Sequence, residues 1–141
     1  MTYKKLQTFT DGGARGNPGP AALGVVIKQD GQVIKAFGEY MGETTNNQAE
    51  YTAVIRALET VKEFGAEEVD CYMDSELVVK QMKGEYRVKN QGLAVLHLKI
   101  WNLLHSFKQV HFHHIRREKN TEADAEVNRA IDQALRVGSR R

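Results

Sequence analysis

The chain lacks several features that would place it in common protein classes. Cys71 is its one cysteine, so no disulfide can form within the chain. No stretch approaches the roughly 20 apolar residues of a membrane span, and the first residues, MTYKKLQTFTDGG, lack the apolar run of a signal peptide. The formal net charge of +2 is too small to indicate a nucleic-acid partner by itself, although basic residues gathered on one face would allow one. We therefore expect a cytoplasmic protein with no membrane association.

The sequence also has no P-loop, zinc-ligand pattern, internal repeat or low-complexity tract. Its 141 residues, 41% hydrophobic and 27% charged, suit one ordinary domain with a real core. We expect this domain to span residues 1–135. The remaining residues 136–141, RVGSRR, are expected to form a short basic tail.

Hydrophobic periodicity predicts five strands and four helices. The expected strands cover residues 6–10, 22–28, 32–40, 67–73 and 110–115. A helical stripe covers residues 50–61; Thr45 or Asn46 can cap this helix and Gly65 can end it. The other expected helices cover residues 76–82, 93–107 and, opened by Thr121 or Glu122, 124–135. The resulting order, βββαβααβα, predicts an α/β fold with a five-stranded mixed sheet flanked by helices.

Four acidic residues stand where a carboxylate is costly: Asp11, Glu50, Asp74 and Asp124. Asp11 and Asp74 follow expected strands, at the edge of an α/β sheet where sites assemble. Glu50 and Asp124 each interrupt the apolar stripe of a helix. Each alone has a structural interpretation, since an Asp after a strand is often a turn residue and a Glu in a first helical turn often serves the helix dipole. Together they favour a shared role as ligands of cations, which would offset their mutual repulsion.

Clustered carboxylates suit Mg²⁺, a hard ion that prefers oxygen ligands. Two such ions about 4 Å apart can activate a water and stabilise the leaving oxygen of a phosphoryl displacement, without a covalent nucleophile. We therefore expect metal-assisted phosphoryl chemistry with two Mg²⁺ ions as cofactors, and with Mn²⁺ able to replace them.

The phrases around these acidic residues resemble those of type 1 ribonuclease H. Each phrase carries one of the four, and together they extend over residues 6–132: FTDGGARGNPGPAALGVV, TTNNQAEYTAVIRALE, YMDSELVVKQMKGEYRVKN and REKNTEADAEVN. The resemblance implies a ribonuclease H-like fold and an endonuclease that hydrolyses the RNA strand of RNA–DNA hybrids. It also implies that the four acidic residues are catalytic metal ligands, with Asp11 bridging the two ions.

The same resemblance implies contacts to the RNA strand. Asn17, Asn46 and Asn47 match positions that read this strand across the minor groove. An amide can donate to and accept from a 2′-hydroxyl, which DNA lacks. All three residues can also serve as turn or cap residues.

For the DNA strand, the resemblance points to a phosphate pocket. Thr45 and Asn90 match its residues. A basic residue often stands two positions before the threonine in this family, and here Glu43 takes that place.

Two further features concern proton handling and substrate binding. His114 lies ten residues before Asp124, where many bacterial members carry a histidine that assists proton transfer or product release, and we expect it to assist catalysis. Other members use an arginine at the position of Arg117. The basic helix that several bacterial members insert after the second helix is absent. Candidates to replace its grip on the hybrid are Lys83, Arg87, Lys89, Arg136, Arg140 and Arg141.

Two other interpretations stay open. The chain would also fit a nuclease of the same fold that acts on double-stranded RNA or on DNA ends, or a non-catalytic domain that binds hybrids. For the leading interpretation we expect an RNA–DNA hybrid as partner, no obligate protein partner and a monomer.

Overall fold

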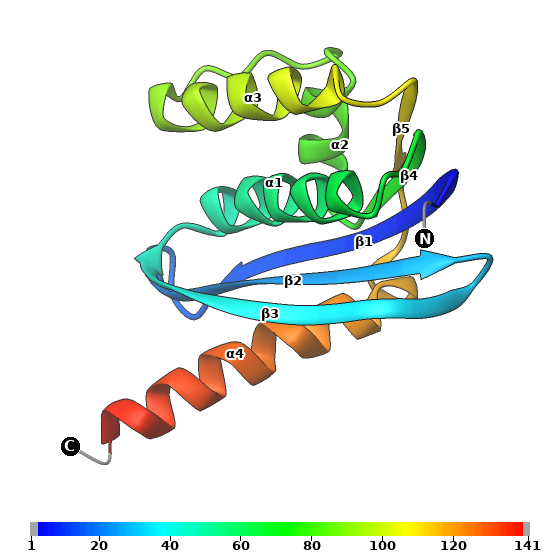
Figure 1. Ribbon diagram of the computed structural model, residues 1–141. Coiled ribbons are helices and arrows are strands. Elements are labelled where there is room, and N and C mark those ends of the chain that lie inside the picture. The colour runs from blue at the N-terminus through cyan, green and yellow to red at the C-terminus, as the bar shows by residue number, and fades with distance from the viewer. Residues whose placement is uncertain (1–2, 140–141) are drawn as a thin grey trace.

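Five strands form one mixed sheet in the order β3-β2-β1-β4-β5 in the computed structural model, which describes residues 3–139 (Figure 1). The strands are β1 (Lys5–Ala14), β2 (Gly19–Gln29), β3 (Gln32–Thr44), β4 (Glu68–Met73) and β5 (Gln109–His114). The helices are α1 (Asn46–Glu63), α2 (Glu76–Met82), α3 (Gln91–Leu104), the short 3₁₀ helix η1 (Arg117–Lys119) and α4 (Thr121–Ser139). The first three strands form an antiparallel meander, and β4 and β5 join β1 in parallel. The predicted element order and mixed sheet are confirmed.

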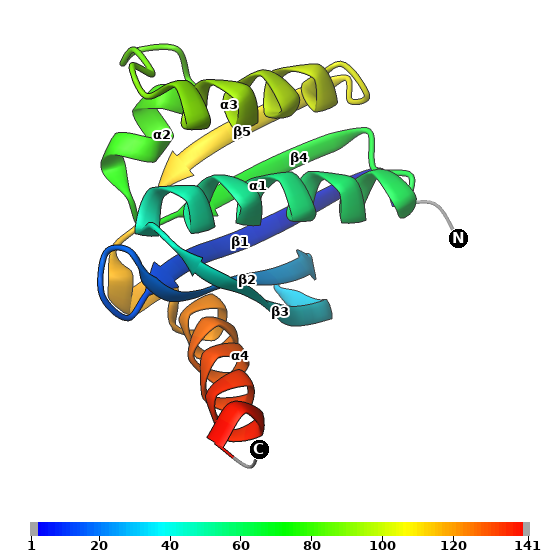
Figure 2. The ribbon, with the colours of Figure 1, turned by 90° about the vertical axis from the view of Figure 1, so that its left-hand side faces the viewer.

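Helices cover both faces of this sheet. α1 and α3 lie on one side, whereas α4 crosses the other side beneath β1, β2 and β3 (Figures 1 and 2). The parallel pairing explains the helices that precede β4 and β5, namely α1, α2 and α3, because a strand can pair in parallel with its neighbour only through a crossover connection.

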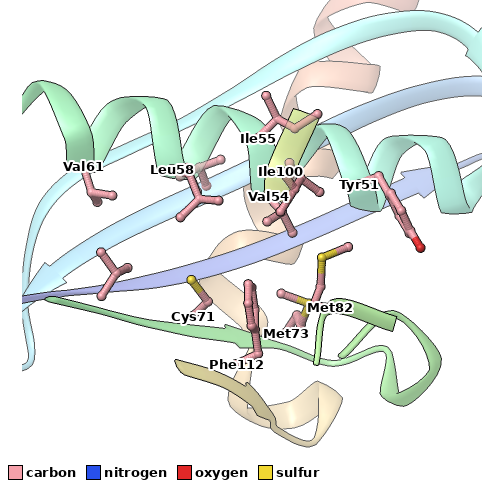
Figure 3. Close-up of a cluster of buried hydrophobic side chains, with 14 of the residues drawn as sticks. Tyr51, Val54, Ile55, Leu58, Val61, Cys71, Met73, Met82, Ile100 and Phe112 are labelled. Atoms are coloured by element: carbon pink, nitrogen blue, oxygen red, sulfur yellow. The ribbon is translucent and has the colours of Figure 1, made fainter. Parts of the chain in front are cut away.

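The main hydrophobic core lies between the sheet and α1. The buried face of α1 carries Tyr51, Val54, Leu58 and Val61 and packs over β1 and β2. Cys71 of β4 and Phe112 of β5 belong to the same core cluster (Figure 3). The predicted stripe of the first helix is therefore confirmed. A second, much smaller cluster of Ala22, Val127 and Ile131 lies between the sheet and α4.

The turns and the helix cap that the sequence predicted from neighbouring residues are present in the structure. The Thr45 side chain accepts a hydrogen bond from Gln48 N at 3.2 Å and caps α1. Gly65, just past the end of α1, has φ of 79°, the left-handed conformation that ends many helices. Asp30 and Gly31 both have positive φ, 48° and 83°, as a two-residue hairpin turn requires.

Three strands are longer than predicted, among them β2, which covers Gly19–Gln29 instead of residues 22–28. β1 continues through Asp11 to Ala14, because residues 11–14 pair with β2 although Gly12 and Gly13 favour strands weakly. β3 likewise extends to Thr44, the residue before the cap of α1. Asp11 therefore lies within a strand rather than after one, and the prediction that it ends its strand was wrong.

The last helix also exceeds its prediction. α4 continues to Ser139, so residues 136–139, assigned to a tail, are helical. Leu135, the last residue of the predicted helix, is 43% exposed, because α4 projects beyond the sheet (Figure 1). Arg136 belongs to the last turn of α4, and Arg140 and Arg141 lie outside the described residues. None of the described helices has the length and apolar character needed to cross a membrane.

Candidate active site

Three of the four predicted carboxylates converge at one edge of the sheet. Asp11, Glu50 and Asp74 each place one carboxylate oxygen within 4.8 Å of the others. Their elements explain the convergence. The parallel pairing of β1 with β4 ends at Thr10 and Met73, so Asp11 and Asp74 are the next residues of adjacent strands. This carboxyl edge of parallel strands is where α/β folds place their sites.

Glu50 reaches the same point because α1 approaches β1 very closely. A Cβ atom on Gly12 would lie 2.3 Å from Ala49 C and from Glu50 N. Only glycine allows this approach, which brings the first turns of α1 against the strand that carries Asp11. Glycine at position 12 is thus a condition for the carboxylate group, in addition to the acidic residues themselves.

Asp124 joins from the other face of the sheet. It lies in the first turn of α4 and lines the same hollow as Asp11, Glu50 and Asp74. Its side chain interacts with that of Asp11. All four predicted carboxylates therefore face one hollow, three of them as a tight group and Asp124 beside it.

The electrostatics of this group favour a bound cation. Burial, together with the neighbouring Asp74 and Asp124, raises the pKa of Asp11 to about 8, although the Gly12 N–H, 3.0 Å from Asp11 Oδ1, acts in the opposite direction. Burial and Asp74 raise the pKa of Glu50 to about 7, against the opposing charge of Arg117. Crowded carboxylates that resist ionisation alone are stabilised by a divalent ion. A donor set made only of oxygens suits a hard divalent cation.

One polar residue of this edge was missed by the sequence reasoning. The Asn120 side chain, between η1 and α4, is buried and donates from Nδ2 to Asp74 Oδ2 at 3.0 Å and to Thr10 O at 2.9 Å. The sequence offered one signal, an asparagine directly before a helix, but that signal indicates a cap and no contact with distant strands.

The two candidates for proton handling lie in different places. His114 ends β5, is exposed and interacts electrostatically with Glu76. Among the described residues, those that line the carboxylate hollow include Arg117 but not His114. The structure therefore brings Arg117 to the carboxylates and leaves His114 at their periphery.

Two of the asparagines near the start of α1 are linked to each other and to β1 by hydrogen bonds. Asn17 Oδ1 accepts from Asn46 N at 3.1 Å, and Asn46 Oδ1 accepts from Ala14 N at 2.7 Å. Asn47 lies beside them, half-buried in the first turn of α1. The side chain of Asn46 thus orients the end of β1, and the cap of α1 is Thr45 alone.

Thr45 and Asn90 hold equivalent positions in two helices. Asn90 Oδ1 accepts from Leu93 N at 3.0 Å and caps α3, as Thr45 caps α1. The two helix starts are close neighbours, since a Cβ atom on Gly92 would lie 3.4 Å from Gln48 Nε2. Residues 83–90 connect α2 directly to α3, so the predicted absence of an inserted helix is confirmed.

Comparisons with known proteins agree with this architecture. A family model described as reverse transcriptase-like matches residues 9–130. Ribonuclease HI of Halobacterium salinarum is 39% identical over 131 residues, which cover 92% of this chain and 66% of that protein. Ribonuclease H of Acidithiobacillus ferrooxidans is 37% identical over 157 residues, and the alignment covers 100% of this chain and 96% of that protein. The chain spans only 36% of a bifunctional relative from Mycobacterium tuberculosis.

A solved structure extends the likeness to three dimensions. The crystal structure of LC11-RNase H1 in complex with an RNA/DNA hybrid is 49% identical, superposes with a TM-score of 0.88 and covers 92% of this chain and 99% of its own. This overlap establishes the ribonuclease H-like fold that the four sequence phrases implied. The chain belongs to the type 1 ribonuclease H family.

Proposed function

We propose that this chain is an endonuclease that hydrolyses the RNA strand of RNA–DNA hybrids with the help of divalent cations. The observation that carries the proposal is the group of Asp11, Glu50 and Asp74, whose carboxylate oxygens lie within 4.8 Å of one another. The structure of LC11-RNase H1 with an RNA/DNA hybrid supports the choice of substrate.

The cofactor we propose is a pair of Mg²⁺ ions, replaceable by Mn²⁺, held by Asp11, Glu50, Asp74 and Asp124. When bound, such ions activate a water for in-line attack on a phosphodiester and stabilise the leaving oxygen. In the free protein the raised pKa values of Asp11 and Glu50 keep a share of these carboxyls protonated near neutral pH. Cation binding would therefore release protons and weaken as the pH falls.

Recognition of the RNA strand is assigned to Asn17, Asn46 and Asn47. The Oδ1 atoms of Asn17 and Asn46 are occupied by backbone N–H groups. Neither Nδ2 group has a hydrogen-bond partner among the described residues, which leaves both free to donate to a 2′-hydroxyl. Because that hydroxyl is absent from DNA, these donors would favour RNA in the cleaved strand.

We assign the DNA strand to the paired starts of α1 and α3. Unpaired N–H groups and the positive end of the helix dipole at each start favour a phosphate. Thr45 and Asn90 fix both starts through their capping hydrogen bonds. Replacing either residue with alanine is expected to raise KM for the hybrid more than it lowers kcat.

His114 is proposed to assist proton transfer or product release, with Arg117 as the alternative. We expect His114→Ala to lower kcat about tenfold and to change the shape of its pH profile, as loss of a proton carrier does. Arg117→Ala is the matched comparison, because Arg117 lies in the hollow. An unchanged rate and pH profile for His114→Ala would exclude the histidine.

One assay tests the proposed activity as a whole. Labelled RNA–DNA, RNA–RNA and DNA–DNA duplexes are incubated with the protein in Mg²⁺, Mn²⁺ or EDTA. We expect cleavage of the RNA strand of the hybrid, only with metal, and its loss in Asp11→Asn. Cleavage of RNA–RNA as well would widen the substrate class, and binding without cleavage in either metal would contradict the proposal.

We further propose that the enzyme acts in the cytoplasm as a monomer without an obligate protein partner. Size-exclusion chromatography coupled to light scattering checks the oligomeric state. A stable dimer at micromolar concentration would contradict a monomer.

A further inference from the structure

Asn120 connects the separate parts of the carboxylate site. It is 2% exposed and lies between η1 and α4. Its Nδ2 group donates both to the carbonyl of Thr10, the residue before Asp11, and to the carboxylate of Asp74. Its backbone carbonyl accepts from the N–H of Asp124 at 3.2 Å. One residue is therefore bonded to the end of the β1–β4 pairing, to one acidic residue directly and to the backbone of another.

The chemistry of a primary amide fits this position. Its NH₂ group carries two donors in a fixed plane, and here each serves a different acceptor. A lysine or arginine could also donate to Asp74, but its positive charge would compete with a cation for the carboxylate. The neutral amide restrains the Asp74 carboxylate and leaves its negative charge available.

The other end of the amide argues against a role in stability alone. Asn120 Oδ1 is buried and has no hydrogen-bond partner among the residues that the structure describes. An unpaired buried acceptor costs about 1–3 kcal/mol. A side chain selected only to fill this space would avoid that cost, whereas one selected for its two donors has to accept it.

We propose that Asn120 is a positioning residue that holds the Asp74 carboxylate in the arrangement that binds divalent cations. The proposal rests on the proposed function for its catalytic consequence, but its effect on cation affinity is independent of the substrate. Outer residues that orient metal ligands typically contribute 10- to 100-fold to metal affinity or activity.

The test compares Asn120→Ala with the parent protein in three measurements. These are Mn²⁺ affinity by electron paramagnetic resonance of the free ion, kcat and KM on an RNA–DNA hybrid, and the melting temperature in EDTA. We expect Mn²⁺ affinity and kcat each to fall about tenfold or more, with KM for the hybrid changed less than about twofold. Asn120→Ser, whose single hydroxyl donor cannot serve both acceptors, should show a smaller loss in the same direction.

Two controls separate positioning from general destabilisation. Val61→Ala removes a fully buried methyl pair at the far end of α1, and it should lower the melting temperature while Mn²⁺ affinity stays unchanged. In an Asp74→Asn background, Asn120→Ala should cost little further affinity, since residues that act through one another are non-additive.

The outcomes are distinguishable. A lower melting temperature with unchanged Mn²⁺ affinity in Asn120→Ala would overturn the proposal, and so would a full tenfold loss that persists in the Asp74→Asn background. If the parent protein binds Mn²⁺ but cleaves no hybrid, the proposed function fails, and the affinity measurements still decide the role of Asn120.

Discussion

The two faces of the sheet hold their helices by different means. On the α1 side, 22 buried residues of the described chain form one continuous cluster. On the α4 side the corresponding cluster has three. α4 is attached instead by close backbone contact, since Cβ atoms on Gly24 and Gly38 would lie 2.2 Å from Ala123 O and 2.4 Å from Glu126 O.

Ion pairs also hold α4 against the sheet, but they contribute less stability than the main hydrophobic core. Lys28 pairs with Glu122, and Arg15 with Asp132, each at 2.7 Å. The side chains of these four partners are 20–55% exposed, and ion pairs that solvent reaches contribute little to the free energy of unfolding. By contrast, burying one large apolar side chain contributes about 1.5–3 kcal/mol.

The difference places the acidic residues in two classes. Asp11, Glu50 and Asp74 stand on elements that the large core fixes, whereas Asp124 depends on how α4 sits against the strands. It follows that global stability resides mainly on the α1 side, and that the geometry of the fourth carboxylate can change with little effect on that stability.

The largest expected effect separates the two classes of carboxylate. Asp11→Asn should lower the rate of hybrid cleavage about 10³-fold or more, because Asp11 faces the other three acidic residues and removal of its charge removes several kcal/mol of cation stabilisation. Asp124→Asn should cost about tenfold less, since Asp124 lies beside the tight group. Single-turnover rates at saturating Mg²⁺ measure both variants. Equal losses of rate in the two would contradict the division of the carboxylates into two classes.

A second pair of variants tests where stability and geometry reside. Gly24 pairs with Asp11 across the β1–β2 ladder and touches the start of α4. Gly24→Ala would push α4 away, so we expect kcat to fall about tenfold with a loss of about 1–3 kcal/mol in stability.

Leu58→Ala, in the large core, is the matched change. It should cost about 2–5 kcal/mol and leave kcat unchanged at temperatures where the protein is folded. Urea denaturation and steady-state kinetics of both variants are the measurement. A larger loss of stability in Gly24→Ala than in Leu58→Ala, with kcat lowered only in Leu58→Ala, would show that α4, and not α1, anchors the fold.

The pH dependence of the cation-free protein gives a smaller effect. Asp11 and Glu50 have raised pKa values in the folded state, about 8 and about 7. The folded protein therefore binds more protons than the unfolded chain between about pH 4 and pH 8, and stability falls as the pH rises through this range. Relative to an Asp11→Asn, Glu50→Gln double variant, the parent should lose a few kcal/mol between these pH values.

Urea denaturation in EDTA at a series of pH values checks this slope. Added Mg²⁺ should restore the stability of the parent at pH 8 and leave the double variant unaffected. A flat difference between the two proteins across the range would contradict the crowding of these carboxylates.

The smallest expected effect concerns the end of the chain. Removing the residues after Val137 should raise KM for the hybrid about twofold to threefold at low salt, with kcat unchanged, because each lost phosphate contact weakens binding in a salt-dependent way. The difference should disappear at high salt. Identical KM values at all salt concentrations would show that these residues make no contact with the substrate.

Much of the fold was predictable because its signals are local. The stripe from Val54 to Val61 has helical spacing, Thr45 is a favourable cap, and Asp30-Gly31 is a hairpin signal, and all three depend on neighbours in the sequence. The four carboxylates were conspicuous since each occupies a position where burial of a charge is costly.

The rest depends on contacts between distant segments. β1 continues past Asp11 because β2 offers a paired strand, which overrides the weak strand preference of Gly12 and Gly13. From its neighbours in the sequence, Asn120 is interpreted only as a helix cap, because its partner Thr10 lies 110 positions earlier in the chain. No periodicity in a single sequence reports such a pairing.

That separation has a consequence for the order of events in folding. A hydrogen bond between residues 110 positions apart closes a very long loop, and the entropy lost in closing it has to be recovered by contacts that form at the same time. The meander and α1, whose contacts are local, can assemble without it. A refolding chain should therefore regain its circular dichroism before it regains tight Mn²⁺ binding. Cation affinity then reports when the last segment has packed, and the proposed nuclease activity would return only with it.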